Sequence, residues 1–251
     1  MNPKEILSHT CHRPFPLPQG PWLMKQGWND LLCAHWPVDS DDLLPLIPRG
    51  LELEHWHGRP WVSIIPFRLK PMRIRGIPPL PFVGDFLELN VRTYVIRNGK
   101  PGIFFLNLEA SNPMAVSGAR MLAHLPYHQA RMLIRYGDPQ TFDYTSFRKL
   151  PRHDDAVFKG VYKPCNDTVV HAEPGTLIHW LTERYCLYTL SPRGEVMVGD
   201  IHHLPWPLQE AELQMESNTM TNYHGFELRD SPAITTYSKK LEVLFWALRK
   251  C

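Results

Sequence analysis

The cysteines of this 251-residue chain form no recognisable set. Cys11, Cys33, Cys165, Cys186 and Cys251 are odd in number and far apart, and no Cys-x-x-Cys occurs. This pattern argues against a disulfide framework or a structural zinc site, and it favours a reducing, cytoplasmic compartment. Cys33 and Cys186 lie in apolar runs, where a cysteine is usually a small core residue.

The chain also lacks an excess of charge of either sign. It has 27 Lys and Arg against 25 Asp and Glu, a net charge of +2, and no basic stripe or reader motif for nucleic acid. No apolar run reaches the length of about 18 residues typical of a membrane helix, and the first residues lack the apolar core of a signal peptide. We therefore expect a soluble cytoplasmic protein without a nucleic-acid or membrane partner.

Several familiar catalytic motifs are missing. The sequence contains no Gly-x-Ser-x-Gly, no Gly-x-Gly-x-x-Gly and no phosphate-cradling loop, so serine hydrolases, dinucleotide dehydrogenases and P-loop enzymes are poorly supported. His202 and His203 are adjacent, and adjacent residues of a strand point to opposite faces. They therefore do not form a metal site together. We expect no metal and no cofactor, with one of the two, His202 in our assignment, facing a pocket.

Proline, by contrast, is abundant, with 25 residues, and short apolar runs separated by turn residues predict a mostly antiparallel β barrel or sandwich. We expect one domain over residues 1–251, with an extended proline-rich arm at 1–20. Asn98-Gly99 predicts a hairpin between strands at 85–97 and 103–110, and a second hairpin is expected between 51–55 and 61–69. Further strands are expected at 28–36, 130–136, 141–149, 156–162, 185–190, 195–202 and 241–248.

Few helices are expected. Asn112 followed by Pro113 predicts a helix that runs to about His124, and residues 174–183 predict a second. Residues 209–222 suit a third helix, although 209–216 alternate enough to be a strand.

Five segments together resemble one family, in the same order along the chain. They are WNDLL and AHWP (28–37), ELNVRTYV (88–95), GAR with HLPY (118–127), LTERYCLY (181–188) and IHHLPWPL (201–208). Each resembles a segment of the YqjF-like family of uncharacterised bacterial proteins, which is similar to the acetoacetate-decarboxylase-like superfamily. The resemblance covers nearly the whole chain. It implies an α+β, mostly antiparallel fold, a β barrel or cone with a few peripheral helices and a central cavity.

The resemblance also implies a missing nucleophile. Decarboxylases of the superfamily use a lysine whose pKa is lowered by burial and by a second lysine, and which forms a Schiff base with a β-keto acid. Tyr127 and His128 stand where these two lysines would be, and neither forms an imine as a lysine does. A pocket glutamate of the superfamily falls near Glu88. The resemblance thus implies a pocket that lacks the Schiff-base chemistry, with Tyr127, His128 and Glu88 as candidate proton-transfer residues.

The run 88–94 adds candidate binding residues. Alternate residues of a strand share a face, so Glu88, Asn90, Arg92 and Tyr94 point one way. Arg92 is suited to hold a carboxylate bidentately. The alternative is a solvent-facing strand surface that carries a Glu–Arg pair.

Two further signals have ordinary explanations. Glu183 and Tyr185 would share a face if their segment were a strand, which makes Glu183 a candidate binding residue, but the end of a helix explains the segment as well. Lys239 and Lys240 are the only adjacent lysines, and a solvated edge of the last strand explains them.

Two hypotheses follow. The chain is either a small-molecule-binding protein or enzyme whose pocket takes a small organic acid or ketone, or a non-catalytic structural or interaction protein that kept only the fold. A homo-oligomer is compatible with both.

Overall fold

The computed structural model describes residues 1–78, 84–151 and 153–251. The strands are β1 (Met24–Pro37), β2 (Glu52–Leu53), β3 (Trp61–Ile74), β4 (Phe86–Arg97), β5 (Lys100–Ala110), β6 (Tyr127–Gln129), β7 (Arg131–Gly137), β8 (Thr141–Arg148), β9 (Ala156–Pro164), β10 (Cys186–Leu190), β11 (Val196–His202), β12 (Gln209–Asn218), β13 (Ile234–Phe245) and β14 (Arg249–Lys250). The helices are α1 (Pro3–Ser8), α2 (Ser40–Leu43), α3 (Pro113–Ala123) and α4 (Leu177–Thr182), with 3-10 turns η1 (Leu44–Leu46) and η2 (Asn222–His224).

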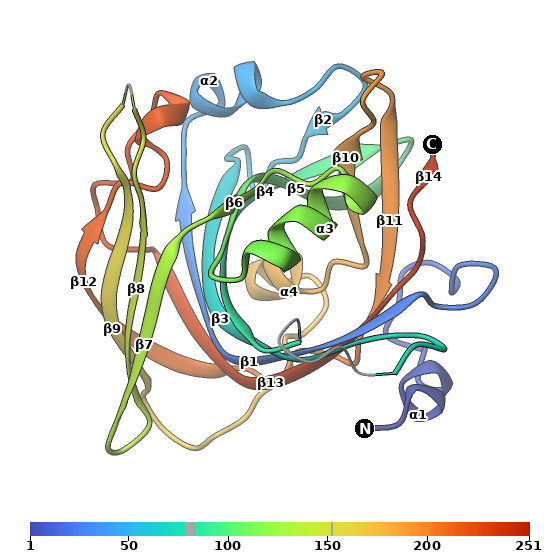
Figure 1. The fold of residues 1–251 in the computed structure, drawn as a ribbon, viewed down its shortest axis with the longest axis horizontal. Coiled ribbons are helices and arrows are strands. Elements are labelled where there is room, and N and C mark those ends of the chain that lie inside the picture. Colours follow the sequence, from blue (N-terminus) through green and yellow to red (C-terminus); the bar gives the residue numbers. More distant parts are fainter. Residues whose placement is uncertain (79–83, 152) are drawn as a thin grey trace.

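Seven strands form a closed ring in the order β1, β3, β4, β5, β10, β11 and β13 (Figure 1). β13 pairs with β1 over most of its length and with β11 through two residue pairs, which closes the ring. Every neighbouring pair in the ring is antiparallel except β5 and β10, which are parallel and share two residue pairs. The ring therefore has two weakly paired sides, one between β5 and β10 and one between β11 and β13.

A second antiparallel sheet of β7, β8, β9 and β12 lies beside the ring (Figure 1). It joins the ring where β12 pairs with the start of β13. The apolar core between the sheet and the ring wall includes Leu89 and Val91 of β4 and the aromatic residues Tyr144, Phe158 and Tyr162 of the sheet. We call this the outer core.

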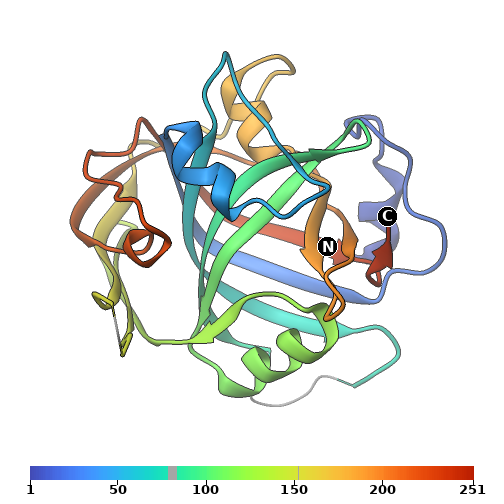
Figure 2. The same ribbon diagram turned by 90° about the horizontal axis from the view of Figure 1, so that it is seen from above.

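The helices α3 and α4 lie at opposite ends of the ring. Figure 1 looks into the ring with α3 in front and α4 behind, and Figure 2 shows them on opposite sides. The Asn112 side chain caps α3 by accepting from the amides of Met114 and Ala115, as the sequence predicts. Val116 of α3 and Ile178 of α4 pack into the cluster of buried residues inside the ring.

Most of the predicted strands are confirmed, and the differences concern pairing and length. The Asn98-Gly99 turn is present, with both residues at positive φ. The hairpin expected between 51–55 and 61–69 is wrong, because β2 pairs with β4 instead. Residues 209–218 form a strand and not a helix. β13 begins at Ile234 and not at residue 241.

No helix in the described ranges combines the length and the apolar character needed to cross a bilayer.

Candidate functional site

The polar run of β4 lies inside the molecule. Glu88, Asn90, Arg92 and Tyr94 are 5%, 7%, 4% and 0% exposed, so the solvent-facing alternative is wrong. In the register with β3, Arg92 lies opposite Ser63 and Glu88 opposite Phe67. Phe67 belongs to the cluster inside the ring. These four β4 side chains therefore face the ring interior.

The Arg92 guanidinium has few partners. Its Nη2 donates to the Leu181 carbonyl of α4 over 3.0 Å, and its buried Nε has no hydrogen-bond partner among the residues that the structure describes. The carbon at the centre of the guanidinium lies 5.8 Å from the ring centroid of Tyr94. None of the ion pairs found within the described ranges includes Arg92. A cation buried without a counter-ion is costly.

The carboxyl group of Glu88 is hydrogen-bonded with the hydroxyl group of Tyr127. Burial raises the pKa of Glu88 to about 8, and a hydrogen bond with the Tyr127 side chain partly opposes this shift. Burial also raises the pKa of the Tyr127 hydroxyl, with the nearby Glu88 carboxyl adding to the effect. Oε2 of Glu88 has no partner. At neutral pH the carboxyl is therefore mostly protonated and can give a proton away.

A chain of three polar side chains borders Arg92. Nδ1 of His35 lies 2.6 Å from the Ser63 hydroxyl, which lies 2.5 Å from the Tyr94 hydroxyl. Burial, together with the Arg92 charge, lowers the pKa of His35 to about 3. His35 is therefore neutral at physiological pH, and the chain adds hydrogen-bonding capacity without charge.

Strand β1 adds a thiol, and strand β13 adds two hydroxyl groups. Cys33 lies opposite Thr236 in the β1–β13 register, and burial raises the pKa of its thiol to about 11, although the charge of Arg92 opposes the shift. The Thr236 hydroxyl lies within hydrogen-bonding reach of the Cys33 thiol, and the buried Ser238 hydroxyl has no partner among the described residues. Sequence analysis missed Cys33, His35, Ser63, Thr236 and Ser238, because only the strand register brings them to Arg92.

A buried ion pair lies beside this group. Nη1 of Arg184 is 2.6 Å from Oε2 of Glu54, and the other oxygen of Glu54 accepts from the Trp180 indole over 2.8 Å. The Arg184 guanidinium lies over the rings of Tyr94 and Trp180 at 5.0 and 4.5 Å. Unlike Arg92, Arg184 has its counter-ion.

His128 does not join Tyr127. Adjacent residues of a strand point to opposite faces, and His128 lies toward Arg120, whose Nη2 is 3.4 Å from His128 Nδ1. Burial and the charges of Arg148 and Arg120 lower the pKa of His128 to about 4. The two residues predicted as a pair thus lie on opposite sides of β6.

Glu183 and His202 also lie apart from the β4 residues. Glu183 accepts hydrogen bonds from the Tyr185 hydroxyl and, over 2.9 Å, from the Trp206 amide. His202 contacts the N-terminal arm, with Nε2 2.9 Å from the Ile6 carbonyl and Nδ1 3.1 Å from Arg13. Both side chains connect segments of the fold.

The adjacent lysines lie on the surface. Lys239 is exposed, and the side chain of Lys240 is 52% exposed, with its amine 3.6 Å from Glu242. Across the described ranges, no three His, Cys, Asp or Glu side chains are grouped as metal ligands.

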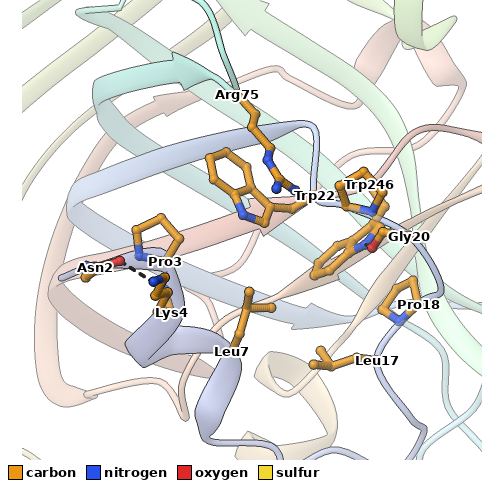
Figure 3. Close-up of a pocket in the computed structure, with 11 residues that line it drawn as sticks. Asn2, Pro3, Lys4, Leu7, Leu17, Pro18, Gly20, Trp22, Arg75 and Trp246 are labelled. Atoms are coloured by element: carbon orange, nitrogen blue, oxygen red, sulfur yellow. Dashed lines mark hydrogen bonds between the residues drawn. The ribbon is translucent and has the colours of Figure 1, made fainter.

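Concavities lie at two places on the described surface that bear on the site. One of about 530 Å³ lies between the N-terminal arm and the body, where Arg75 stacks on Trp22 and Trp246 bonds to the Gly20 carbonyl (Figure 3). The other, of about 250 Å³, is lined by Leu46, Phe104, Phe105, Leu106, His124, Pro126, Tyr188, Thr189, Leu190 and His224. It lies on the side of the ring where β5 and β10 meet.

The chain matches the uncharacterised conserved protein family DUF2071 over residues 25–242. The chain belongs to this family. It is 46% identical over 235 residues to the uncharacterised protein YqjF of Bacillus subtilis (strain 168), a match that covers 93% of this chain and 95% of that protein. The predicted YqjF-like relationship is confirmed, and it extends almost from end to end of both proteins.

Solved structures of low sequence identity share the fold. Acetoacetate decarboxylase from Legionella pneumophila is 13% identical with a TM-score of 0.62, and the match covers 96% of this DUF2071 chain and 93% of that one. The enduracididine biosynthesis enzyme MppR, complexed with pyruvate, is 10% identical with a TM-score of 0.60, over 95% and 93%. The predicted acetoacetate-decarboxylase-like fold is confirmed.

Proposed function

We propose that the ring interior of this DUF2071 protein binds a small organic acid and that Arg92 anchors its carboxylate. The observation that carries the proposal is the buried Arg92 guanidinium, which lacks a carboxylate partner in the described structure and has an unbonded Nε. Charge-assisted hydrogen bonds from an arginine to a carboxylate are strong and directional. An acid bound there would supply the counter-ion that the fold does not.

The charge of the surroundings supports an anion. Glu88, with a pKa of about 8, is mostly protonated at pH 7, and His35 and Cys33 are neutral at that pH. The neighbouring Arg184 is neutralised by Glu54. One positive charge, that of Arg92, therefore remains uncompensated in this region.

The uncharged groups support a ligand with a second polar function. Oδ1 of Asn90 and the Ser238 hydroxyl are buried and have no partner in the described ranges, and the Thr236 hydroxyl lies beside Cys33. A carbonyl or hydroxyl group next to the carboxylate would use these groups. Glu88, hydrogen-bonded with Tyr127, is placed to exchange a proton with the bound molecule. Tyr127 in the superfamily lysine position supports chemistry without a Schiff base.

Thermal shift and titration calorimetry with pyruvate and acetoacetate test the proposal, with acetone as the uncharged comparison. MppR is solved in complex with pyruvate, which makes pyruvate a reasonable first probe. We expect both acids to stabilise the protein, by about 2.7 kcal/mol at one hundred times Kd, and acetone to have no effect. Arg92→Gln should weaken binding about 10- to 100-fold, the value of a charged hydrogen bond.

Arg148→Gln is the matched control, because Arg148 is a nearly buried arginine of the outer core. It should lower stability and leave acid affinity unchanged. Equal affinity in wild type and Arg92→Gln would refute the role of Arg92. The absence of binding by any small carboxylate would favour a protein that kept only the fold.

A further inference from the structure

The ring wall has a seam between β5 and β10. The two strands pair only where Leu187 and Tyr188 meet Ile103 and Phe104. Further along, β5 pairs with β6 instead, through residues 108–110. The concavity of about 250 Å³ lies at this seam, lined by residues of both strands. Backbone pairing is limited to two residue pairs here, as it also is between β11 and β13.

Phe105 borders both the concavity and the ring interior. It lines the concavity, and it packs against the two clusters of buried residues that face the ring interior. A bulge in the β4–β5 register places it directly opposite Arg92, and opposite residues in such a pair have Cβ atoms about 5 Å apart. The half-buried Phe105 is thus the partition between open surface and the Arg92 guanidinium.

The other border of the seam is a short loop. His124 ends α3 at positive φ, and its carbonyl accepts from the Thr189 hydroxyl of β10 over 2.7 Å. This side-chain hydrogen bond connects loop and strand where no ladder exists. A side-chain contact opens at lower cost than a strand ladder, because fewer hydrogen bonds break.

We propose that the β5–β10 seam is the entry route to the ring interior and that Phe105 controls passage through it. The inference rests on the proposed function, since the molecule admitted is the small organic acid that Arg92 binds. Small, flat carboxylates pass when the Phe105 ring rotates aside, and branched or bulky acids are held back. Phe105 is a selectivity residue and takes no part in chemistry.

Cys33 provides a test that needs no ligand. Its thiol lies inside the ring, is fully buried and is close enough to Arg92 for that charge to affect its pKa. The protein with Cys11, Cys165, Cys186 and Cys251 replaced by serine is treated at pH 8 with an anionic methanethiosulfonate, and labelling is followed by mass. We expect Phe105→Ala to speed the labelling of Cys33 at least tenfold, and the milder Phe105→Leu by a smaller factor.

Phe104→Ala is the matched control. Phe104 is the neighbouring residue and lines the same concavity, but it packs against clusters outside the ring. It should lower stability about as much as Phe105→Ala and leave the labelling rate within twofold of the parent. Equal rates in the parent and Phe105→Ala, or equal acceleration by both alanine variants, would overturn the proposal.

The assay separates the entry route from the proposed function. Pyruvate is absent from the labelling experiment. If the protein binds no acid but Phe105→Ala still speeds the labelling of Cys33, the entry route is supported and the proposed acid binding is refuted. If the protein binds pyruvate through Arg92 but Phe105→Ala does not change the labelling rate, the acid binding is supported and the entry route is refuted.

Discussion

Two arginines with little exposure lie on opposite sides of the same ring wall, in contrasting surroundings. Arg92 faces the ring interior without a carboxylate partner among the described residues. Arg148 of β8 lies in the outer core, 11% exposed, with Nε 2.8 Å from the fully buried Glu109 of β5. Asn107 also donates to Glu109, over 3.2 Å. One cation has its counter-ion within the fold and the other does not.

The difference separates a structural role from a ligand-binding one. The Arg148–Glu109 pair connects the second sheet to the ring, because its members belong to β8 and β5. Removing either member would leave a buried charge without a partner, which is strongly destabilising. Arg92 has no such partner to leave behind, so its replacement tests function more than stability.

The largest contrast is expected when each arginine is replaced by methionine. Arg148→Met should lower the free energy of unfolding by about 3–5 kcal/mol at pH 8, because Glu109 is left buried and unpaired. Arg92→Met should raise it by about 1 kcal/mol in the absence of ligand, since an uncompensated buried charge is removed. Urea unfolding monitored by tryptophan fluorescence measures both. A loss of several kcal/mol in Arg92→Met would mean that Arg92 is structural.

Glu88 inside the ring and Glu109 in the outer core should affect stability differently as the pH changes. Burial raises the pKa of Glu88 from 4.5 to about 8, so the folded protein holds a proton that the unfolded chain loses between these values. Stability therefore falls as pH rises through this window and levels off above it. Glu88→Gln should remove this loss and be more stable than wild type at pH 8 by up to about 4 kcal/mol.

The corresponding substitution in the outer core, Glu109→Gln, should lower the stability at pH 8, where Glu88→Gln raises it. Burial raises the pKa of Glu109 to about 7 against the opposing charge of Arg148, so at pH 8 the pair is ionised. Glu109→Gln should then cost about 3 kcal/mol, because Arg148 loses its counter-ion. Urea titrations at pH 5 and pH 8 measure both variants. The same sign for Glu88→Gln and Glu109→Gln at pH 8 would contradict the contrast.

The smallest effect is expected at the surface lysines. Lys240→Ala should change stability by less than about 0.5 kcal/mol, because the Lys240 side chain is exposed and its contact with Glu242 is long, at 3.6 Å. Acetoacetate with borohydride should leave the mass of the protein unchanged, since neither Lys239 nor Lys240 is buried as a Schiff-base lysine must be. A mass increase on either residue would restore imine chemistry to this protein.

The sequence was sufficient for local structure. Strand positions followed from apolar runs and turn residues, the Asn98-Gly99 hairpin from turn chemistry, and α3 from its Asn112 cap. The shared face of Glu88, Asn90, Arg92 and Tyr94 followed from strand periodicity alone. These features depend on neighbours within a few residues, which is the range that sequence patterns report.

Pairing between distant segments could not be predicted. His35, Ser63, Thr236 and Cys33 meet Arg92 through the registers of β1 with β3 and β13, which no local pattern encodes. The pairing of β2 with β4 was missed for the same reason, since residues 51–55 suit either partner. His128 was assigned beside Tyr127 because adjacency in sequence was given more weight than the alternation of strand faces.

One strand makes assembly of this architecture depend on the end of the chain. β13 pairs with β1, β11 and β12, so it completes the ring and attaches the second sheet. During synthesis the 14-residue β1 emerges about 200 residues before its partner Ile234–Phe245. Until then one edge of β1 stays open to wrong pairing, as unpaired strand edges do. A nascent chain that stalls before residue 234 would therefore be prone to aggregation.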